Sequence, residues 1–319
     1  MGFLPDNASE KVSFRVTQNV ITSEVAGMVI NGIFNTQNEV PLLVEVMCLQ
    51  PEIFGSVNKL QAKGYDSLEP TYNCSVSSNL FNSIQSGTNW TAHLTLAKSL
   101  YSILDDISGV PPTDARFHES FDHYYDNLSA RQCHSKPLPC KLVNGINSTT
   151  CVDQTIADEV YRLGQYEYSY IYRDDPRSLA ASATSYGVWI GELTTHIRDF
   201  INGASDVIYR HNVAHDGSLS RLLSVLQLDV MVWPGMGSEV VFELYKKDTT
   251  TSSTSTATPS SASGYYIRVL WKGQVLRSSN PSLGLMDMVP LETVLGYFDG
   301  LVGVGASLVM GKCNGTIPV

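Results

Sequence analysis

The sequence predicts an α/β fold with a long helical region in the middle of the chain. Near its start, SFRVT (13–17) has the character of a strand, and residues 21–34 have that of the helix behind it. A second strand-then-helix pair follows at 206–214 and 217–228, where leucines recur at helical spacing. From about residue 51 to residue 179 the pattern is mostly helical. Strands followed by helices at both ends of the chain favour an α/β core around this helical region.

Further elements complete this pattern. VPLLVEVM (40–47) reads as another strand, and residues 89–107 are one of the long helical patterns of the middle region. A long helix is predicted over 176–203, with Pro176 near its start and Gly203 near its end.

A hairpin is predicted toward the C-terminus. The strand-like runs VVFELYK (240–246) and YYIRVLWK (265–272) are separated by the Ser/Thr-rich segment 248–263. This segment has almost no apolar surface to bury, so we interpret it as a flexible, O-glycosylated hairpin loop rather than a domain linker.

Charge and hydropathy exclude several classes of partner. The chain has 21 Lys+Arg against 31 Asp+Glu, a formal net charge of -10, and 43% hydrophobic residues. An acidic surface repels nucleic acid and anionic membranes, so neither is expected as a partner. No apolar run has the length of a membrane span.

Sequons and cysteines together favour secretion. Six Asn-x-Ser/Thr sequons occur, at Asn7, Asn73, Asn89, Asn127, Asn147 and Asn314. The six cysteines are expected to be mostly paired: Cys48, Cys74, Cys133, Cys140, Cys151 and Cys313. Their pairing stays open, although Cys133, Cys140 and Cys151 are close enough for a local bridge, and Cys313 is expected to tie down the C-terminal tail. The segment MGFLPDNASE has no signal-peptide pattern, so secretion is inferred from the body of the chain.

A zinc site is the alternative for part of this region. Five potential ligands lie in one stretch: His118, His123, Cys133, His134 and Cys140. Their spacings fit no ordinary ligand pair, and such cysteines are more often bridged. We therefore predict no metal site.

The candidate site is the turn between the strand at 206–214 and its helix. His215 and Asp216 are expected just before the helix N-terminus, where backbone N–H groups and the helix dipole favour a bound anion. A protonated Asp216 beside that anion could donate a proton to a leaving oxygen. The alternative is an Asx-type helix cap with a neighbouring histidine.

These residues, together with WPGMGSEVVFEL, YYIRVLWKGQVL and an Arg-x-Thr motif at Arg15 and Thr17, resemble the histidine acid phosphatases, in particular fungal-type secreted acid phosphatases. This branch of the histidine phosphatase superfamily holds acid phosphatases, lysophosphatidate phosphatases and phytases. Ile21 departs from the pattern, since the family often has a second arginine there.

The resemblance implies a phosphoglycerate-mutase-like, doubly wound core sheet over 1–50 and 180–319, with a helical cap inserted at 51–179. It implies hydrolysis of phosphomonoesters through a phosphohistidine, without a metal or organic cofactor. Arg15 and His215 would bind the phosphate, and Asp216 would protonate the leaving alcohol.

One family motif is missing from the sequence. No RHGxRxP segment, which carries the nucleophilic histidine, occurs in the 319 residues, and the one Arg-His pair, Arg210-His211, continues into Asn212. We therefore expect an N-terminally truncated chain that lacks the first core strand. Two functions follow: an acid phosphatase whose nucleophile is absent from this chain, or an inactive secreted pseudophosphatase that binds a phosphorylated or glycan ligand.

Other polar and aromatic clusters are interpreted as structural. Glu243 is expected to be a buried partner, and the Asp105-Asp106 pair a solvated helix end. His123 is expected to be a residue of the cap, and the aromatic run 166–172 to belong to the helix core or the cap surface.

Overall fold

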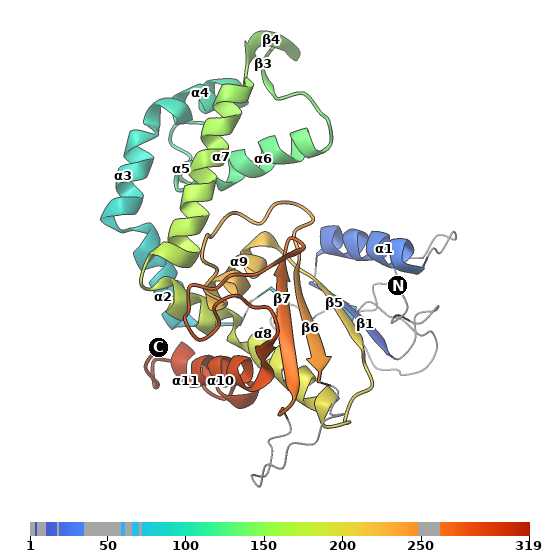
Figure 1. The fold of residues 1–319 in the computed structure, drawn as a ribbon. Helices are drawn as coiled ribbons and strands as arrows, with labels where there is room; N and C mark the ends of the chain where they lie inside the picture. Colours follow the sequence, from blue (N-terminus) through green and yellow to red (C-terminus); the bar gives the residue numbers. More distant parts are fainter. Residues whose placement is uncertain are drawn as a thin grey trace. The chain divides into compact units, whose positions relative to one another are not determined.

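The chain forms two compact units in a computed structural model that describes residues 4, 11–17, 19–34, 59–60, 66–69, 72–247 and 262–319. Unit 1 comprises Met1–Ser78, Leu179–Asp229 and Pro234–Val319, and unit 2 comprises Asn79–Ser178 and Val230–Trp233 (Figure 1). Unit 2 thus begins at residue 79, whereas the sequence places the start of the helical region at residue 51. The strand expected at 40–47 and nearly all of the loop at 248–263 lie outside the described residues.

Unit 1 contains a parallel sheet in the order β2-β1-β5. Its strands are β1 (Val12–Val16), β2 (Lys59–Leu60) and β5 (Tyr209–Val213). In the register of β1 with β5, Phe14 lies opposite His211. The first strand of the sequence therefore pairs directly with the strand that leads to His215.

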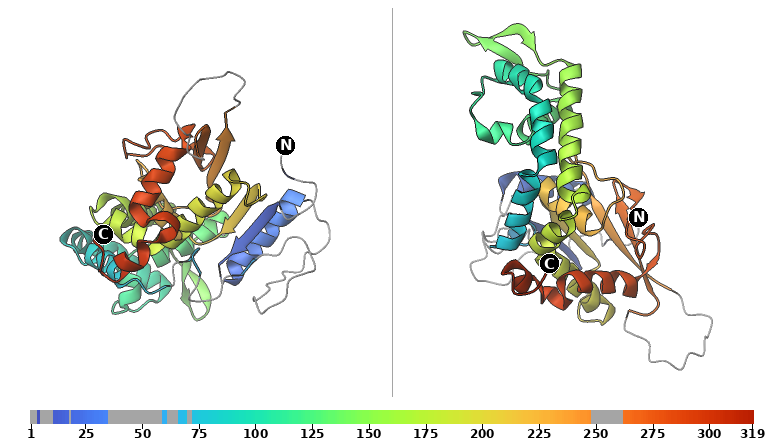
Figure 2. Two further views of the ribbon diagram at one scale, coloured as in Figure 1. Left: turned by 90° about the horizontal axis from the view of Figure 1, so that it is seen from below. Right: turned by 90° about the vertical axis from the view of Figure 1, so that its left-hand side faces the viewer.

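Helices contact both faces of this parallel sheet. Phe14 and its alternate neighbours on β1 pack against α1 (Val20–Phe34), which lies along the strand in Figure 2. Arg15 points to the other face and reaches Glu192 on α8 (Ser178–Ile201). This division follows from the two-residue period of a strand.

A second sheet of unit 1 contains the predicted hairpin. β6 (Val240–Lys246) and β7 (Tyr265–Trp271) pair antiparallel along their whole length, which confirms the two strand-like runs. The short strands β8 (Gln274–Val275) and β9 (Val289–Pro290) pair with β7.

Unit 1 has further helices in its described part. They are α2 (Ser75–Gln85, whose second part belongs to unit 2), α9 (Asp216–Val225), α10 (Leu291–Val302), a 3-10 turn (Val304–Ala306) and α11 (Val309–Cys313). A Cβ on Gly191 of α8 would lie 2.6 Å from the backbone nitrogen of Ala306, so glycine permits this close approach. The Cys74–Cys313 disulfide fixes the C-terminal region, as expected for Cys313.

Unit 2 is helical apart from one hairpin. Its helices are α3 (Thr88–Leu96), α4 (Lys98–Ser108), α5 (Ala115–His118), α6 (Asp122–Cys133), α7 (Gln154–Ser169) and a π-helical turn (Tyr170–Asp174). The hairpin of β3 (Cys140–Val143) and β4 (Ile146–Cys151) lies at one end of these helices (Figure 2) and is closed by the Cys140–Cys151 disulfide. The single helix expected at 89–107 is two helices, because the backbone turns at Ala97 (φ -87°, ψ 4°).

The core of unit 2 includes residues that follow α9 in sequence. The Trp233 ring is sandwiched between Tyr125 and Tyr168, each with a centroid 3.9 Å away. Its backbone N–H donates to the Gln165 side chain at 2.7 Å. Gly164 makes room for this stack, since a Cβ there would collide with Tyr125.

The environment of Asp105 differs from the solvated helix end that the sequence predicts. Asp105 is buried, with a side chain only 9% exposed, and its carboxylate accepts a hydrogen bond from Tyr124 and contacts His118 at 3.0 Å. Of the Asp105-Asp106 pair, only Asp106 is exposed, and it is paired with Lys141. The prediction of a solvated helix end was therefore wrong for Asp105, because its partners come from two other helices.

None of the helices in the described part of the chain combines the length and apolar character needed to cross a membrane.

Candidate functional site

His215 lies at the predicted junction between a strand and a helix. Its backbone is extended (φ -102°, ψ 164°) at the N-cap of α9, two residues after β5 ends. Its carbonyl accepts hydrogen bonds from the N–H groups of Ser218 at 3.1 Å and Leu219 at 3.0 Å. The side chain is not used for capping, so the ring is available for other contacts.

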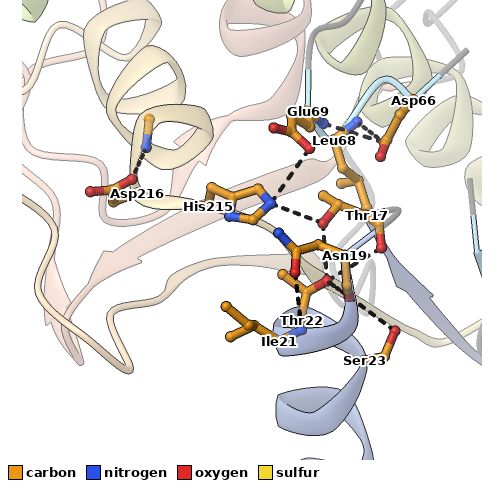
Figure 3. Close-up of polar contacts among 11 residues, drawn as sticks. Thr17, Asn19, Ile21, Thr22, Ser23, Asp66, Leu68, Glu69, His215 and Asp216 are labelled. Carbon is orange, nitrogen blue, oxygen red and sulfur yellow. Dashed lines mark hydrogen bonds and ion pairs between the residues drawn. The ribbon is translucent and has the colours of Figure 1, made fainter. Parts of the chain in front are cut away.

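The ring of His215 contacts the Arg-x-Thr segment. Its Nε2 atom lies 3.1 Å from Oγ1 of Thr17, which is also 3.0 Å from Oγ1 of Thr22 (Figure 3). The Thr17 N–H donates to the Val213 carbonyl. These contacts bring together the carboxyl ends of β1 and β5 and the N-termini of α1 and α9, which is where α/β proteins bind ligands.

Asn19 holds the start of α1 in place. Its side-chain oxygen accepts a hydrogen bond from the Ile21 N–H at 3.0 Å, and its carbonyl accepts one from the Thr22 hydroxyl at 2.8 Å. Ile21 itself is exposed, so the position where the family often has an arginine presents an apolar side chain to solvent.

Arg15 is engaged by an acidic residue on α8. Its Nη1 donates to Oε2 of Glu192 at 2.8 Å, and the Ser67 hydroxyl donates to the same oxygen at 2.8 Å. The Arg15 Nε is buried without a partner. The guanidinium is therefore fixed on the α8 face of the sheet, with its Nε–H left for a further acceptor.

The carboxylate of Asp216 is turned toward its own helix. Its Oδ1 accepts the Gly217 N–H at 2.7 Å, and Figure 3 shows it pointing away from the contact between His215 and Thr17. This contact is a local hydrogen bond within the first turn of α9. To protonate a leaving group, Asp216 would have to rotate.

Glu69 is a neighbour of His215 that the sequence did not indicate. Its Oε2 lies 3.5 Å from Nε2 of His215. It comes from the segment 66–69, which belongs to unit 1 although the sequence assigned it to the helical cap. No motif in this segment marks it as part of the site.

The other histidine of the strand lies in a different environment. His211 packs its ring against Phe14, with centroids 5.7 Å apart, and its Nδ1 lies 2.9 Å from the Tyr209 hydroxyl. Burial lowers the pKa of His211. On α8, burial and the nearby charges of Arg210 and Arg15 lower the pKa of His196.

The residues of the alternative zinc site either have other partners or do not lie together. Cys140 is disulfide-bonded, and His118 contacts the Asp114 carbonyl and the Asp105 carboxylate. Cys133 is a free, exposed thiol, and Cys48 lies outside the described residues. Within the described ranges, no three His, Cys, Asp or Glu side chains gather as metal ligands.

The remaining candidates have structural partners. Glu243 accepts a hydrogen bond from Tyr245 and lies 3.6 Å from Arg268, but its side chain is 35% exposed, so the expectation that it is buried was wrong. His123 is half-exposed beside Asp122. In the aromatic run, Tyr166 stacks on Tyr170.

Comparison with known proteins gives the class of fold. No protein-family model matches the chain, and no curated protein matches it. Among solved structures, the phytase from Citrobacter braakii is similar, with a TM-score of 0.50 and 12% sequence identity over 87% of this chain and 70% of the phytase chain. The chain thus has a mixed α/β fold similar to that of a phytase.

Proposed function

We propose that this chain carries the phosphate-binding part of an acid phosphatase that hydrolyses phosphomonoesters. The observation that carries the proposal is the position of His215, at the N-terminus of α9 and 3.1 Å from Thr17 at the end of β1. A helix N-terminus following a parallel strand stabilises a bound anion through its N–H groups and dipole. The phytase-like fold supports the same interpretation.

The proposed roles follow from this geometry. His215 binds a phosphate oxygen, Arg15 supplies positive charge from the adjacent strand, and Asp216 donates a proton to the leaving alcohol. The Nε–H of Arg15 is buried without a partner and would be left for the anion while Nη1 keeps its contact with Glu192. No metal or organic cofactor is needed for this chemistry.

The nucleophile would come from a segment outside this sequence. Among the described strands, β5 pairs only with β1 and β6 pairs only with β7, so each has one unpaired edge. Figure 1 shows β7, β6, β5 and β1 in this order across unit 1. We propose that the RHGxRxP strand pairs along the open edge of β5 and completes a doubly wound, phosphoglycerate-mutase-like sheet.

A pseudophosphatase is the second candidate. It is favoured by the absence of RHGxRxP from the 319 residues and by the local hydrogen bond from the Gly217 N–H that Asp216 accepts. Such a protein would bind a phosphorylated or glycan ligand without hydrolysing it.

Secretion is part of the proposal. Among the described residues two disulfides are formed, and the sequon asparagines there are all exposed, namely Asn73, Asn89, Asn127, Asn147 and Asn314. Exposure is what attached glycans require. These features fit a fungal-type secreted glycoprotein.

The test compares residues 1–319 with a version that includes an in-frame RHGxRxP segment from the upstream coding region. Inorganic phosphate should raise the melting temperature of residues 1–319, and His215→Asn should abolish the rise. The matched control His123→Asn changes a half-exposed histidine of unit 2 and should keep it. Retention of phosphate binding by His215→Asn would refute the site.

Turnover separates the two functions. Residues 1–319 should have negligible activity on p-nitrophenyl phosphate, and the extended form should hydrolyse it. An extended form that binds phosphate without turnover would support the pseudophosphatase. Robust turnover by residues 1–319, lost in His211→Ala, would identify His211 as the nucleophile and overturn the proposed mechanism.

A further inference from the structure

Glu69 lies beside the atom of His215 that would bind an anion. Its Oε2 is 3.5 Å from Nε2, the same ring nitrogen that contacts Thr17 (Figure 3). The site proposed for phosphate therefore already contains a carboxylate. A carboxylate in that position repels an incoming anion unless a positive charge compensates it.

The backbone that carries Glu69 is held in place. The Asp66 carboxylate accepts hydrogen bonds from the N–H groups of Leu68 at 2.9 Å and Glu69 at 3.3 Å. The Leu68 side chain is buried, and the Ser67 hydroxyl donates to Glu192. The turn that carries Glu69 is therefore held in place by Asp66, Ser67 and Leu68, the three residues that precede Glu69.

The side chain of Glu69 is accessible to a ligand. It is 47% exposed and the His215 side chain is 30% exposed, so solvent and ligand reach both groups. Arg15, the cation proposed to help bind the phosphate, is already paired with Glu192 at 2.8 Å. The partner of Glu69 in the structure is His215 itself, so the charge of Glu69 acts directly on a ligand that binds His215.

We infer that Glu69 determines specificity by selecting phosphomonoesters that carry an ammonium group near the phosphate. The ammonium group would pair with Glu69 while the phosphate binds His215, whereas a phosphoester without a cation binds His215 against the repulsion of Glu69. This inference rests on the proposed phosphate site. It adds a class of substrate to the proposed function. Its test can contradict the role of Glu69 without contradicting the phosphate site.

Two ligands that differ in one cation test the inference. Phosphoethanolamine and ethyl phosphate are titrated into residues 1–319 by calorimetry. The wild-type chain should bind phosphoethanolamine about fivefold more tightly, as expected for a partly exposed charge pair. Glu69→Gln should bring the two dissociation constants together, mainly by strengthening ethyl phosphate binding, and Glu69→Lys should reverse the preference.

The controls separate Glu69 from the site itself. Glu24→Gln removes the same charge from the exposed surface of α1 and should leave the wild-type preference unchanged. His215→Asn should lose both ligands. An unchanged preference in Glu69→Gln, with binding lost in His215→Asn, would overturn the inference and leave the proposed function standing; binding that survives His215→Asn would overturn the function as well.

Discussion

His93 and Glu167 form a buried pair in unit 2, with Nε2 of His93 2.7 Å from Oε1 of Glu167. The second carboxylate oxygen of Glu167 accepts the Phe121 N–H at 2.8 Å. Each oxygen of this carboxylate therefore has a donor, and the pair joins α3, α7 and the start of α6. Burial raises the pKa of Glu167, and the hydrogen bond from His93 partly opposes that rise.

Glu167→Gln should destabilise unit 2. An amide has only one acceptor oxygen, so one of the two donors, His93 or the Phe121 N–H, would face an NH2 group. Leaving a buried donor unsatisfied costs about 1–3 kcal/mol. Chemical denaturation would measure the loss of stability, and hydrogen exchange in α3 and α7 would locate it. An unchanged free energy of unfolding would show that the pair contributes nothing to stability.

Gly164→Ala should also destabilise unit 2. Its Cβ would collide with the Tyr125 ring and lie 3.0 Å from Trp233, which disrupts the aromatic sandwich. Such overpacking costs about 1–3 kcal/mol. Gly296→Ala is the matched control, since Gly296 is also helical and its Cβ would meet nothing within 4 Å. Equal effects of the two substitutions on thermal unfolding would contradict the packing argument.

Local sequence patterns predicted the elements of the core, because each pattern reports the face that its own segment buries. The helix expected at 176–203 is α8 (Ser178–Ile201), and the turn at His215 separates a strand from a helix. The charged partners could not be predicted in this way. Glu192 lies 177 residues from Arg15, and Asp105 is buried by His118 and Tyr124, which its own helix does not contain.

The two disulfides should differ in their contributions to stability. Cys74–Cys313 closes a separation of 239 residues, whereas Cys140–Cys151 closes 11. Constraining a longer loop removes more entropy from the unfolded chain, so the double substitution to serine at 74 and 313 should cost about 2–5 kcal/mol, and the pair at 140 and 151 less. Thermal melts of both double variants would test this order.

Thiol titration of the unreduced, denatured protein checks the pairing itself. Cys133 should react, and the four bridged cysteines should not. Four or more reactive thiols would contradict both the structure and the expectation that most cysteines are paired.

The stability of unit 1 should decrease as the pH falls below neutral. The pKa values of His211 and His196 are lowered in the folded chain, in both cases mainly by burial. The unfolded chain therefore binds more protons once the pH falls below about 6.5, and the free energy of unfolding decreases through that range. His211→Gln should flatten the slope between pH 7 and pH 5, as measured by denaturation at each pH. A slope that stays unchanged would show that His211 is not responsible, and His123→Gln serves as the exposed control.

Asp216→Asn should reveal whether Asp216 is the proton donor in the form extended by RHGxRxP. A proton donor matters most when the leaving group is a poor one, so phosphoenzyme formation should slow far more for an alkyl phosphate than for p-nitrophenyl phosphate. Asparagine can still accept the Gly217 N–H that Asp216 accepts at 2.7 Å, so the start of α9 should be preserved. The measurement is the pre-steady-state rate of phosphoenzyme formation for both substrates. Equal slowing for the two would assign Asp216 a structural role at the start of α9 alone, because a structural effect does not depend on the basicity of the leaving group.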